Sequence, residues 1–203
     1  MITETQFDAV FDCQQVFKTL MNTLARPGTI GSIADSTSKI AGENAPLMAA
    51  GLALLDNWRK FFVFGDEELK ENLRELTYGV PSPLEEADYL FVAKGCLDEL
   101  NCHEILSQAK IGTLAEPHKS ATIFIMLDSL TGGEESVLTG PGVKESIQIT
   151  LPETGRIWVE ERQRMNFEFP CGLELYFMTP QGEVMGIPRK IKIGGENKWD
   201  MLQ

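Results

Sequence analysis

The spacing of apolar residues predicts an amphipathic helix near the start of the chain. Apolar side chains recur at steps of three and four residues, which places them on one stripe of a helix; the stripe is made of Val10, Cys13, Phe17, Leu20 and Leu24. The helix should end near Arg26, because the residue before a proline avoids the helical conformation and Gly28 permits a turn. Residues 31–44 are polar and contain two glycines, so they predict a loop with room for a short edge strand.

Three further helices are predicted from the same kind of pattern. Residues 46–55 are apolar on every side, which is typical of a buried helix. Asp66 and Asp98 each precede a helical segment and are expected to cap it through their carboxylates. In the helix after Asp66 we expect one apolar face, formed by Leu69, Leu73 and Leu76.

Strands are predicted between these helices. Residues 58–65, 88–93 and 121–127 are strand-like, and the last of them carries no charge, so we expect it in the centre of the sheet. Helix and strand alternate through residue 127, which favours an α/β fold with helices packed on the faces of a sheet. The remaining segments predict strands at 135–142, 143–151, 173–179 and 182–188, and a helix at 156–167. Because some late strands form hairpin-like pairs, we expect a mixed sheet.

Composition places the chain among ordinary globular proteins. It has 203 residues, of which 43% are hydrophobic and 24% charged. With no break in composition, we expect a single α/β domain over residues 1–193 and a polar tail over 194–203. No apolar run approaches the roughly 18 residues of a membrane span, and the acidic start MITETQFDAVFD is unlike a signal peptide, so a cytoplasmic protein is expected.

Charge and ligand counts argue against two classes of function. The net charge of −12 disfavours nonspecific binding to nucleic acid, which needs clustered cations, and we expect neither a nucleic-acid nor a membrane partner. A metal site is not expected either, because the few soft ligands are poorly spaced; they are Cys13, Cys96, Cys102, Cys171, His103 and His118. Reduced and mostly buried thiols are the simpler interpretation.

Catalytic and nucleotide-binding motifs are mostly missing. There is no Walker A string, and Gly140 and Gly142 lack the third glycine of a dinucleotide fingerprint. Ser36 and Lys39 match the S-x-x-K of serine acylases, but the companion motifs are absent and the stretch is expected to be a loop. His118, which a Ser–His–acid triad would need, stands in another expected loop and is better explained as a surface residue.

Three stretches together resemble one known family. They are FDCQQVFKTLMNTLARPGTI at 11–30, SLTGGEESVLTGPGV at 129–143 and FPCGLELYFMTPQGEVMGIPRKIKI at 169–193. Their order, their spacing and the total length are similar to the PhnH family, the H subunit of the bacterial carbon–phosphorus lyase core complex. The resemblance runs from about residue 7 to 193.

This resemblance implies a fold, a role and partners. The implied fold is a three-layer α/β/α arrangement with a mixed sheet, similar to pyridoxal-phosphate-dependent transferases but without the cofactor. The implied role is in organophosphonate catabolism, in the synthesis of alpha-D-ribose 1-methylphosphonate 5-triphosphate from a nucleotide and a phosphonate. The implied partners are the G, I and J subunits, and a homodimer is expected when the chain is alone. No cofactor is expected.

The glycine-rich turn at the end of VLTGPG is one candidate for a ligand or partner surface. Pro141 suits the first central position of a type II turn, and Gly142 suits the second, where φ must be positive. The turn that follows Gly140 could simply link two strands. Alternatively, the amides of Gly142 and Val143 face a pocket or a partner subunit.

Two arginines are the other candidates. Arg26 stands at a helix C-terminus, where a cation is favoured by the helix dipole, and Arg189 follows Pro188 between two apolar segments. The simpler interpretations are a favourable charge at the helix end for Arg26 and an exposed arginine at a strand edge for Arg189. Alternatively, either guanidinium clamps a phosphate or carboxylate, and Glu174 is a candidate partner for either. Cys171 is better explained as a small buried residue than as a nucleophile.

Three functions are compatible with these observations. The first is a subunit of a multi-protein phosphonate-processing enzyme that lacks a complete active site of its own. The second is a stand-alone α/β enzyme that binds a phosphorylated or carboxylated small molecule through Arg189. The third is a non-catalytic scaffold that positions its partners.

Overall fold

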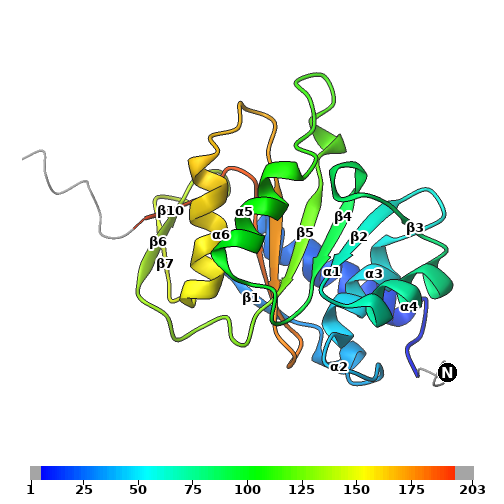
Figure 1. Ribbon diagram of the computed structural model, residues 1–203. Coiled ribbons are helices and arrows are strands. Elements are labelled where there is room, and N and C mark those ends of the chain that lie inside the picture. The colour runs from blue at the N-terminus through cyan, green and yellow to red at the C-terminus, as the bar shows by residue number, and fades with distance from the viewer. Residues whose placement is uncertain (1–5, 195–203) are drawn as a thin grey trace, which may run out of the picture.

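The computed structural model describes residues 6–194 and has a seven-stranded sheet with helices on both faces (Figure 1). The helices are α1 (Phe11–Ala25), α2 (Ala34–Thr37), α3 (Ala45–Leu54), α4 (Glu67–Thr77), α5 (Glu99–Gln108) and α6 (Glu153–Arg164), with single 3-10 turns at Leu84–Glu86 and Pro117–Lys119. The strands are β1 (Ile30–Ser32), β2 (Lys60–Phe64), β3 (Val80–Pro81), β4 (Tyr89–Val92), β5 (Thr122–Met126), β6 (Ser136–Thr139), β7 (Ile147–Ile149), β8 (Glu174–Met178), β9 (Glu183–Ile187) and β10 (Lys192–Gly194). The proposed tail over 194–203 lies outside the described residues except for Gly194.

The large sheet is mixed, as predicted. Its strand order is β1-β9-β8-β5-β4-β2-β3, and β5 occupies the central position expected from its uncharged sequence. All neighbouring strands from β3 to β8 are parallel, whereas β9 is antiparallel to both β8 and β1. The predicted late hairpin is therefore confirmed as β8 and β9. The short strand β3 was not predicted.

Alternating side chains of the strands feed two separate cores. Phe124 stacks between Phe91 and Tyr176 on the face that α1, α3 and α4 cover, with ring centroids 5.3 and 5.0 Å apart. On the other face, Ile123 and Phe177 pack with residues of α5 and α6. Helices, sheet and helices thus form three layers (Figure 1), and a three-layer α/β fold is confirmed.

The predicted capping residues act as expected. The carboxylate of Asp66 accepts a hydrogen bond from the backbone N–H of Leu69, and that of Asp98 accepts one from Asn101, each at 2.9 Å. These bonds satisfy amide groups that have no partner inside the first helical turn. The predicted apolar face of α4 is one residue too long, because Leu76 is exposed at an open groove beside Leu52 and Leu55.

The predicted stripe of the first helix is rotated from the face that α1 actually buries. The buried residues of α1 are Asp12, Val16, Leu20 and Thr23, whereas Val10 is 72% exposed and Phe17 is 47% exposed. The prediction is therefore wrong for Val10 and Phe17. A close approach of α1 to β9 explains the rotation: a Cβ at Gly186 would lie 2.7 Å from the backbone nitrogen of Leu24, so only glycine admits the helix on this side.

Residues 31–44 contain more structure than the predicted loop. The expected short edge strand is present as β1, but the following α2 is a helical turn in which Ser36 and Thr37 are buried. Polar composition led to the loop prediction. The two hydroxyl groups are buried because each finds a hydrogen-bond acceptor, the Asp12 carboxylate for Ser36 and the Ala34 carbonyl for Thr37.

A second sheet departs from the prediction of a single one. Strands β10, β6 and β7 form a three-stranded antiparallel sheet beside α6 (Figure 1). Its buried side chains, among them Leu138, Ile149 and Ile193, join the core beneath α5 and α6.

The buried guanidinium of Arg162 connects this small sheet to the large one. Arg162 projects from α6 and donates hydrogen bonds to the carbonyls of Leu173, Ile187 and Ile191 at 2.8–3.0 Å. The predicted helix at 156–167 is confirmed in its position, although α6 begins earlier and ends at Arg164. No helix in the described part of the chain is both long enough and apolar enough to span a bilayer.

Candidate functional site

The structure brings Arg26 and Gly142 together at one surface hollow. Its volume is about 490 Å³, and it lies between the end of α1 and the loop that joins β6 to β7. The lining residues are Arg26, Pro27, Thr29, Gly142, Lys144, Glu145, Ser146 and Ile147. Arg26 and Gly142 are each candidates from the sequence, whereas Lys144 is not, because nothing in the sequence places that residue near α1.

The predicted type II turn is confirmed by its geometry. Gly142 has a φ of +88°, and the amide of Val143 donates to the carbonyl of Gly140 at 3.1 Å. The turn links β6 to β7, as the simpler interpretation of VLTGPG expected. The amide of Val143 is therefore occupied within the turn, which leaves the Gly142 amide as the group that a ligand or partner could reach.

The same loop contains a residue in an unusual conformation. Glu145 has a φ of +116°, a region that residues with a Cβ rarely adopt. Such strain persists only where surrounding structure imposes it, and it is frequent at binding surfaces. The loop from Gly140 to Ser146 is therefore held in a specific shape against the end of α1.

Two cations at this hollow have no partner within the chain as described. Arg26 is the C-cap of α1, and its carbonyl accepts hydrogen bonds from the backbone and hydroxyl of Thr29. Across residues 6–194, neither the Arg26 guanidinium nor the Lys144 ammonium makes a hydrogen bond or ion pair. Both side chains are exposed.

Arg189 has a different environment. Its guanidinium forms an ion pair with Glu174 at 2.8 Å and donates to the carbonyls of Pro117 and Pro170 at 2.9 and 3.3 Å. The expected pairing of Glu174 with an arginine is thus confirmed. Pro188 and Arg189 stand just after β9, at the amino ends of β5 and β8, whereas open α/β sheets generally bind ligands at the carboxyl ends.

The Gly140–Gly142 turn lies between these two places. A Cβ at Gly140 would be 2.7 Å from the carbonyl oxygen of Lys190, so the turn packs against the segment that carries Arg189. At its other end, Gly142 approaches the ring of Pro27. The predicted site residues therefore form one continuous strip of surface, but Arg26 and Arg189 do not converge on a shared ligand position.

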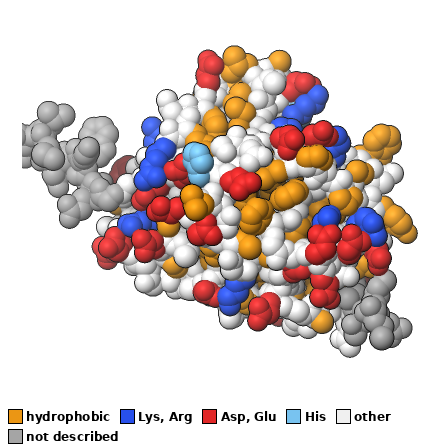
Figure 2. Space-filling view, in the orientation of Figure 1, with side chains coloured by type: hydrophobic (Ala, Val, Ile, Leu, Met, Phe, Trp, Pro, Cys, Tyr) orange, Lys and Arg blue, Asp and Glu red, His pale blue; other side chains and the backbone are white. Residues whose placement is uncertain are grey.

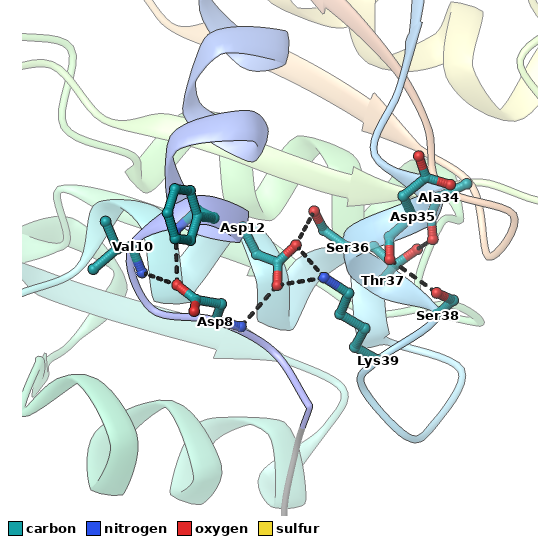
Figure 3. A network of polar contacts seen from close by, with 10 residues as sticks. Asp8, Val10, Asp12, Ala34, Asp35, Ser36, Thr37, Ser38 and Lys39 are labelled. Carbon is teal, nitrogen blue, oxygen red and sulfur yellow. Dashed lines mark hydrogen bonds and ion pairs between the residues drawn. The ribbon is translucent and has the colours of Figure 1, made fainter.

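A buried carboxylate that the sequence reasoning overlooked organises the region before α1 and around α2 (Figure 3). Asp12 is 5% exposed, and Lys39 Nζ lies 2.8 Å from both of its carboxylate oxygens. Ser36 Oγ donates to Oδ1 at 3.0 Å, and the amide of Asp8 donates to Oδ2 at 2.7 Å. These contacts, with the hydrogen bond from Lys39 the largest, lower the pKa of Asp12 below its usual value.

The S-x-x-K string is explained by this network. Ser36 and Lys39 both point at Asp12 from one turn of chain, and Ser36 is 3% exposed. A buried hydroxyl that donates to a carboxylate is not placed to attack a substrate. The sequence shows Ser36 and Lys39 as an S-x-x-K string. It does not show that Asp12 is the residue both contact, because Asp12 stands among the apolar residues of the first helix.

The remaining candidate nucleophiles and bases are dispersed. His118 is exposed in the Pro117–Lys119 turn, as expected, and His103 Nδ1 pairs with Glu161 Oε1 at 2.7 Å between α5 and α6. Cys171 is buried, as expected, and burial raises the pKa of Cys102 to about 12. Within residues 6–194, no group of three or more His, Cys, Asp or Glu side chains is arranged to hold a metal ion.

These features define a class of α/β protein. Several of its candidate polar side chains form hydrogen bonds or ion pairs within the chain, and the loop between β6 and β7 forms an exposed surface with the end of α1. Comparison with models of known protein families gives a match over nearly the whole chain. The model of the PhnH family, described as bacterial phosphonate metabolism protein, matches residues 5–194, so the chain belongs to this family and has a role in phosphonate metabolism. The resemblance inferred from the three sequence stretches is confirmed.

Two curated relatives match almost the whole chain. One is the alpha-D-ribose 1-methylphosphonate 5-triphosphate synthase subunit PhnH of Rhizobium meliloti (strain 1021), 27% identical over 193 residues that cover 93% of this chain and 94% of that protein. Another is the putative C-P lyase subunit protein HtxG of Stutzerimonas stutzeri, 26% identical over 182 residues that cover 89% of this chain and 85% of that protein. Both are named as subunits of a larger system.

Proposed function

We propose that the chain is a subunit of the carbon–phosphorus lyase system and contributes to the synthesis of alpha-D-ribose 1-methylphosphonate 5-triphosphate from a nucleotide and a phosphonate. The observation that carries this proposal is the end-to-end match to the synthase subunit of Rhizobium meliloti. Membership of the PhnH family over residues 5–194 supports it.

The geometry favours a chain that acts only within a complex. Ser36 donates to Asp12, and Arg189 donates to Glu174 and to two carbonyls, so these polar groups are committed to the fold. Cys102 and Cys171 are buried. A nucleophile, a base and an anion clamp would have to meet at one point for autonomous catalysis, and the candidates among residues 6–194 are spread over the surface.

The proposed partners are the G, I and J subunits, and the chain alone is proposed to form a homodimer. The names of both relatives support a multi-subunit assembly. We also propose a cytoplasmic location, which is supported by the free state of Cys13, Cys96, Cys102 and Cys171, because unpaired thiols are typical of reducing compartments.

The test compares assembly of the chain with the proposed partner subunits and turnover by the isolated chain. The purified chain is mixed with tagged G, I and J subunits, and separately with a nucleotide and methylphosphonate alone. We expect stable co-purification and no turnover by the isolated chain. Turnover without partners would favour the stand-alone enzyme, whereas a complex that is fully active without this chain would contradict its proposed contribution to the synthesis.

Gly142 supplies a matched pair of variants for the same assay. Gly142→Val should strain the turn because a β-branched residue resists positive φ, whereas Gly142→Asn should be tolerated. We expect both to fold, as judged by circular dichroism, and only the valine variant to co-purify poorly. Equal recovery of both variants would remove the turn from the proposed partner surface.

We further propose that the fold is related to pyridoxal-phosphate-dependent transferases but carries no such cofactor. The three layers around a mixed sheet support the relationship. The visible spectrum of the purified protein tests the second part. A stoichiometric aldimine absorbance that borohydride abolishes would contradict it, because that signal requires a Schiff-base lysine.

A further inference from the structure

The outward side of α1 carries large apolar residues that the core does not use. Phe17 and Met21 are four residues apart, so they lie above one another on α1, and they are 47% and 50% exposed. Val10, the N-cap residue just before the helix, is 72% exposed. Single exposed apolar residues are ordinary on a protein surface, but an aligned set along one helix indicates a contact surface. Ile30, on the edge strand β1, is also exposed and lies near the C-terminal end of the helix.

The charges on this side differ in sign from the chain as a whole. The net charge of the protein is −12, yet between Phe11 and Arg26 the single carboxylate is Asp12, which is buried. The exposed carboxylate of Asp8 lies just before this segment and accepts hydrogen bonds from the amides of Val10 and Phe11. The exposed ionisable residues of this segment are Lys18 and Arg26. On the face over α5 and α6, acidic side chains are interspersed with lysines and arginines (Figure 2), and Arg156 and Arg164 of α6 form ion pairs with glutamates there. We call Val10, Phe17, Lys18, Met21 and Arg26 the α1 outer face.

We propose that the α1 outer face is the docking surface for another subunit, one that presents an apolar surface flanked by aspartate or glutamate. Aromatic and methionine side chains with arginine are the residue types enriched at protein interfaces. Acidic residues on the partner would complement Lys18 and Arg26 and speed association. This inference rests on the proposed function for the existence of the partner and deepens it by assigning the surface.

Charge complementarity selects such a partner over a second copy of the chain. In a pair of α1 helices related by a two-fold axis, the same residues meet at the axis. Lys18 stands in the middle of Phe11–Ala25, so two ammonium groups would be brought together, which is unfavourable. The homodimer proposed for the isolated chain would therefore use another face.

The α1 outer face continues into the hollow described above. Arg26 lines that hollow together with Lys144 and Gly142, and the adjacent recess that includes Thr29 and Ile30 joins the helix to the edge of the sheet. A partner seated on α1 would thus reach the glycine turn with its acidic margin. This continuity gives the strained loop around Glu145 a role in shaping the margin of the interface.

Binding to the tagged G, I and J subunits tests the surface. Phe17→Ser/Met21→Ser and, separately, Lys18→Glu should each weaken assembly by about tenfold or more, since aromatic anchors and opposed charges dominate interface energetics. The matched controls are Leu100→Ser, an apolar residue 83% exposed on α5, and Arg59→Glu, an exposed cation before β2. Both controls should assemble as the wild type does.

Three results would overturn the proposal. Assembly of the α1 variants with the same affinity as the wild type would refute the proposal. Loss of self-association with unchanged assembly would assign the face to a second copy. A lowered urea midpoint of the isolated Phe17→Ser/Met21→Ser variant would mean that the chain itself covers these side chains.

A synthetic probe separates this inference from the proposed function. An amphipathic helical peptide with a leucine face flanked by glutamates, and a matched peptide with lysines in their place, are added to the ¹⁵N-labelled chain. The glutamate peptide should shift amide signals of residues 10–30, and Phe17→Ser/Met21→Ser should abolish the shifts. If the wild type does not assemble with G, I and J, the proposed function fails, and the peptide result still decides the inference: no shifts, or equal shifts with lysines, refute it.

Discussion

At the scale of single residues, the Asp12 carboxylate holds three parts of the chain together. It accepts hydrogen bonds from the amide of Asp8, the hydroxyl of Ser36 and the ammonium of Lys39 (Figure 3). It also stands in the first turn of α1, where the helix dipole favours a negative charge. A buried acid is thereby satisfied on both oxygens.

This network should make stability depend on acid. Because the folded pKa of Asp12 is lowered, its contribution is complete above the unfolded pKa of about 3.9 and is lost as pH falls through the folded value. In urea unfolding, Asp12→Asn should cost about 1–2 kcal/mol at neutral pH, and the difference from wild type should shrink below about pH 4. Asp35→Asn, an exposed residue of α2, is the control. A difference that does not change with pH would contradict the ion pair.

Arg189 is the second residue whose side chain stabilises the fold through several contacts. Removal of its side chain would leave Glu174 unpaired and the Pro170 carbonyl without a donor, while the Pro117 carbonyl would keep only the amide of Ser120. We expect Arg189→Ala to lower the free energy of unfolding by about 2 kcal/mol, with Arg189→Lys intermediate. Arg74→Ala, which breaks an exposed pair with Glu71 on α4, should cost less than about 0.5 kcal/mol.

Assembly measurements on Arg189→Ala test whether the residue also affects function. The variant should remain folded and co-purify poorly with the other subunits if the contacts of Arg189 hold the partner surface in shape. Normal assembly with loss of complex activity would instead place Arg189 in an active site. Unchanged stability, assembly and activity would show that the residue was wrongly chosen.

At the scale of elements, α1 illustrates what apolar periodicity can and cannot settle. The helix and its end at Arg26 follow from the sequence, but its rotation does not. Apolar residues occupy more of its circumference than the core requires, and the choice is made by Gly186 on β9, a residue distant in sequence. Helix caps, by contrast, depend on neighbours within three residues, so Asp66 and Asp98 were predicted correctly.

The rotation of α1 makes a direct prediction about stability. Leu20 is buried and Phe17 is half exposed, although both belong to the predicted stripe. Leu20→Ala should lower the free energy of unfolding by about 2–5 kcal/mol, whereas Phe17→Ser should change it by less than about 0.5 kcal/mol. Urea titrations of the two variants measure this contrast. Similar losses at both positions would mean that α1 is rotated toward the predicted stripe.

At the scale of the whole molecule, long-range pairing limits what a sequence reveals. The α/β class and the central place of β5 were predictable from alternation and from an uncharged strand. The separation of β6, β7 and β10 into a second sheet was not, because strand partners far apart in the chain leave no periodic signal. The proximity of Lys144 to Arg26 depends on that second sheet, so the hollow could not be predicted either.

Self-association of the isolated chain is the prediction at this scale. Light scattering at micromolar concentration should give about twice the chain mass of 22.6 kDa. Phe17→Ser/Met21→Ser should leave that mass unchanged, since the α1 outer face is assigned to a different partner. A monomeric mass for the wild type would contradict the homodimer and weaken the proposed relationship to dimeric transferases.

The guanidinium of Arg162 has a consequence for how the molecule opens. Burial lowers its pKa, and its hydrogen-bonded acceptors are neutral carbonyls from the start of β8, the end of β9 and the approach to β10. A buried charge is stabilised by its hydrogen-bond acceptors in place of water. The loss of one acceptor therefore makes the burial of the charge costly. Terminal strands commonly fray independently of the domain. Here β10 is coupled to β8 and β9 of the large sheet, and its amide protons should exchange with solvent only when that pair of strands unfolds.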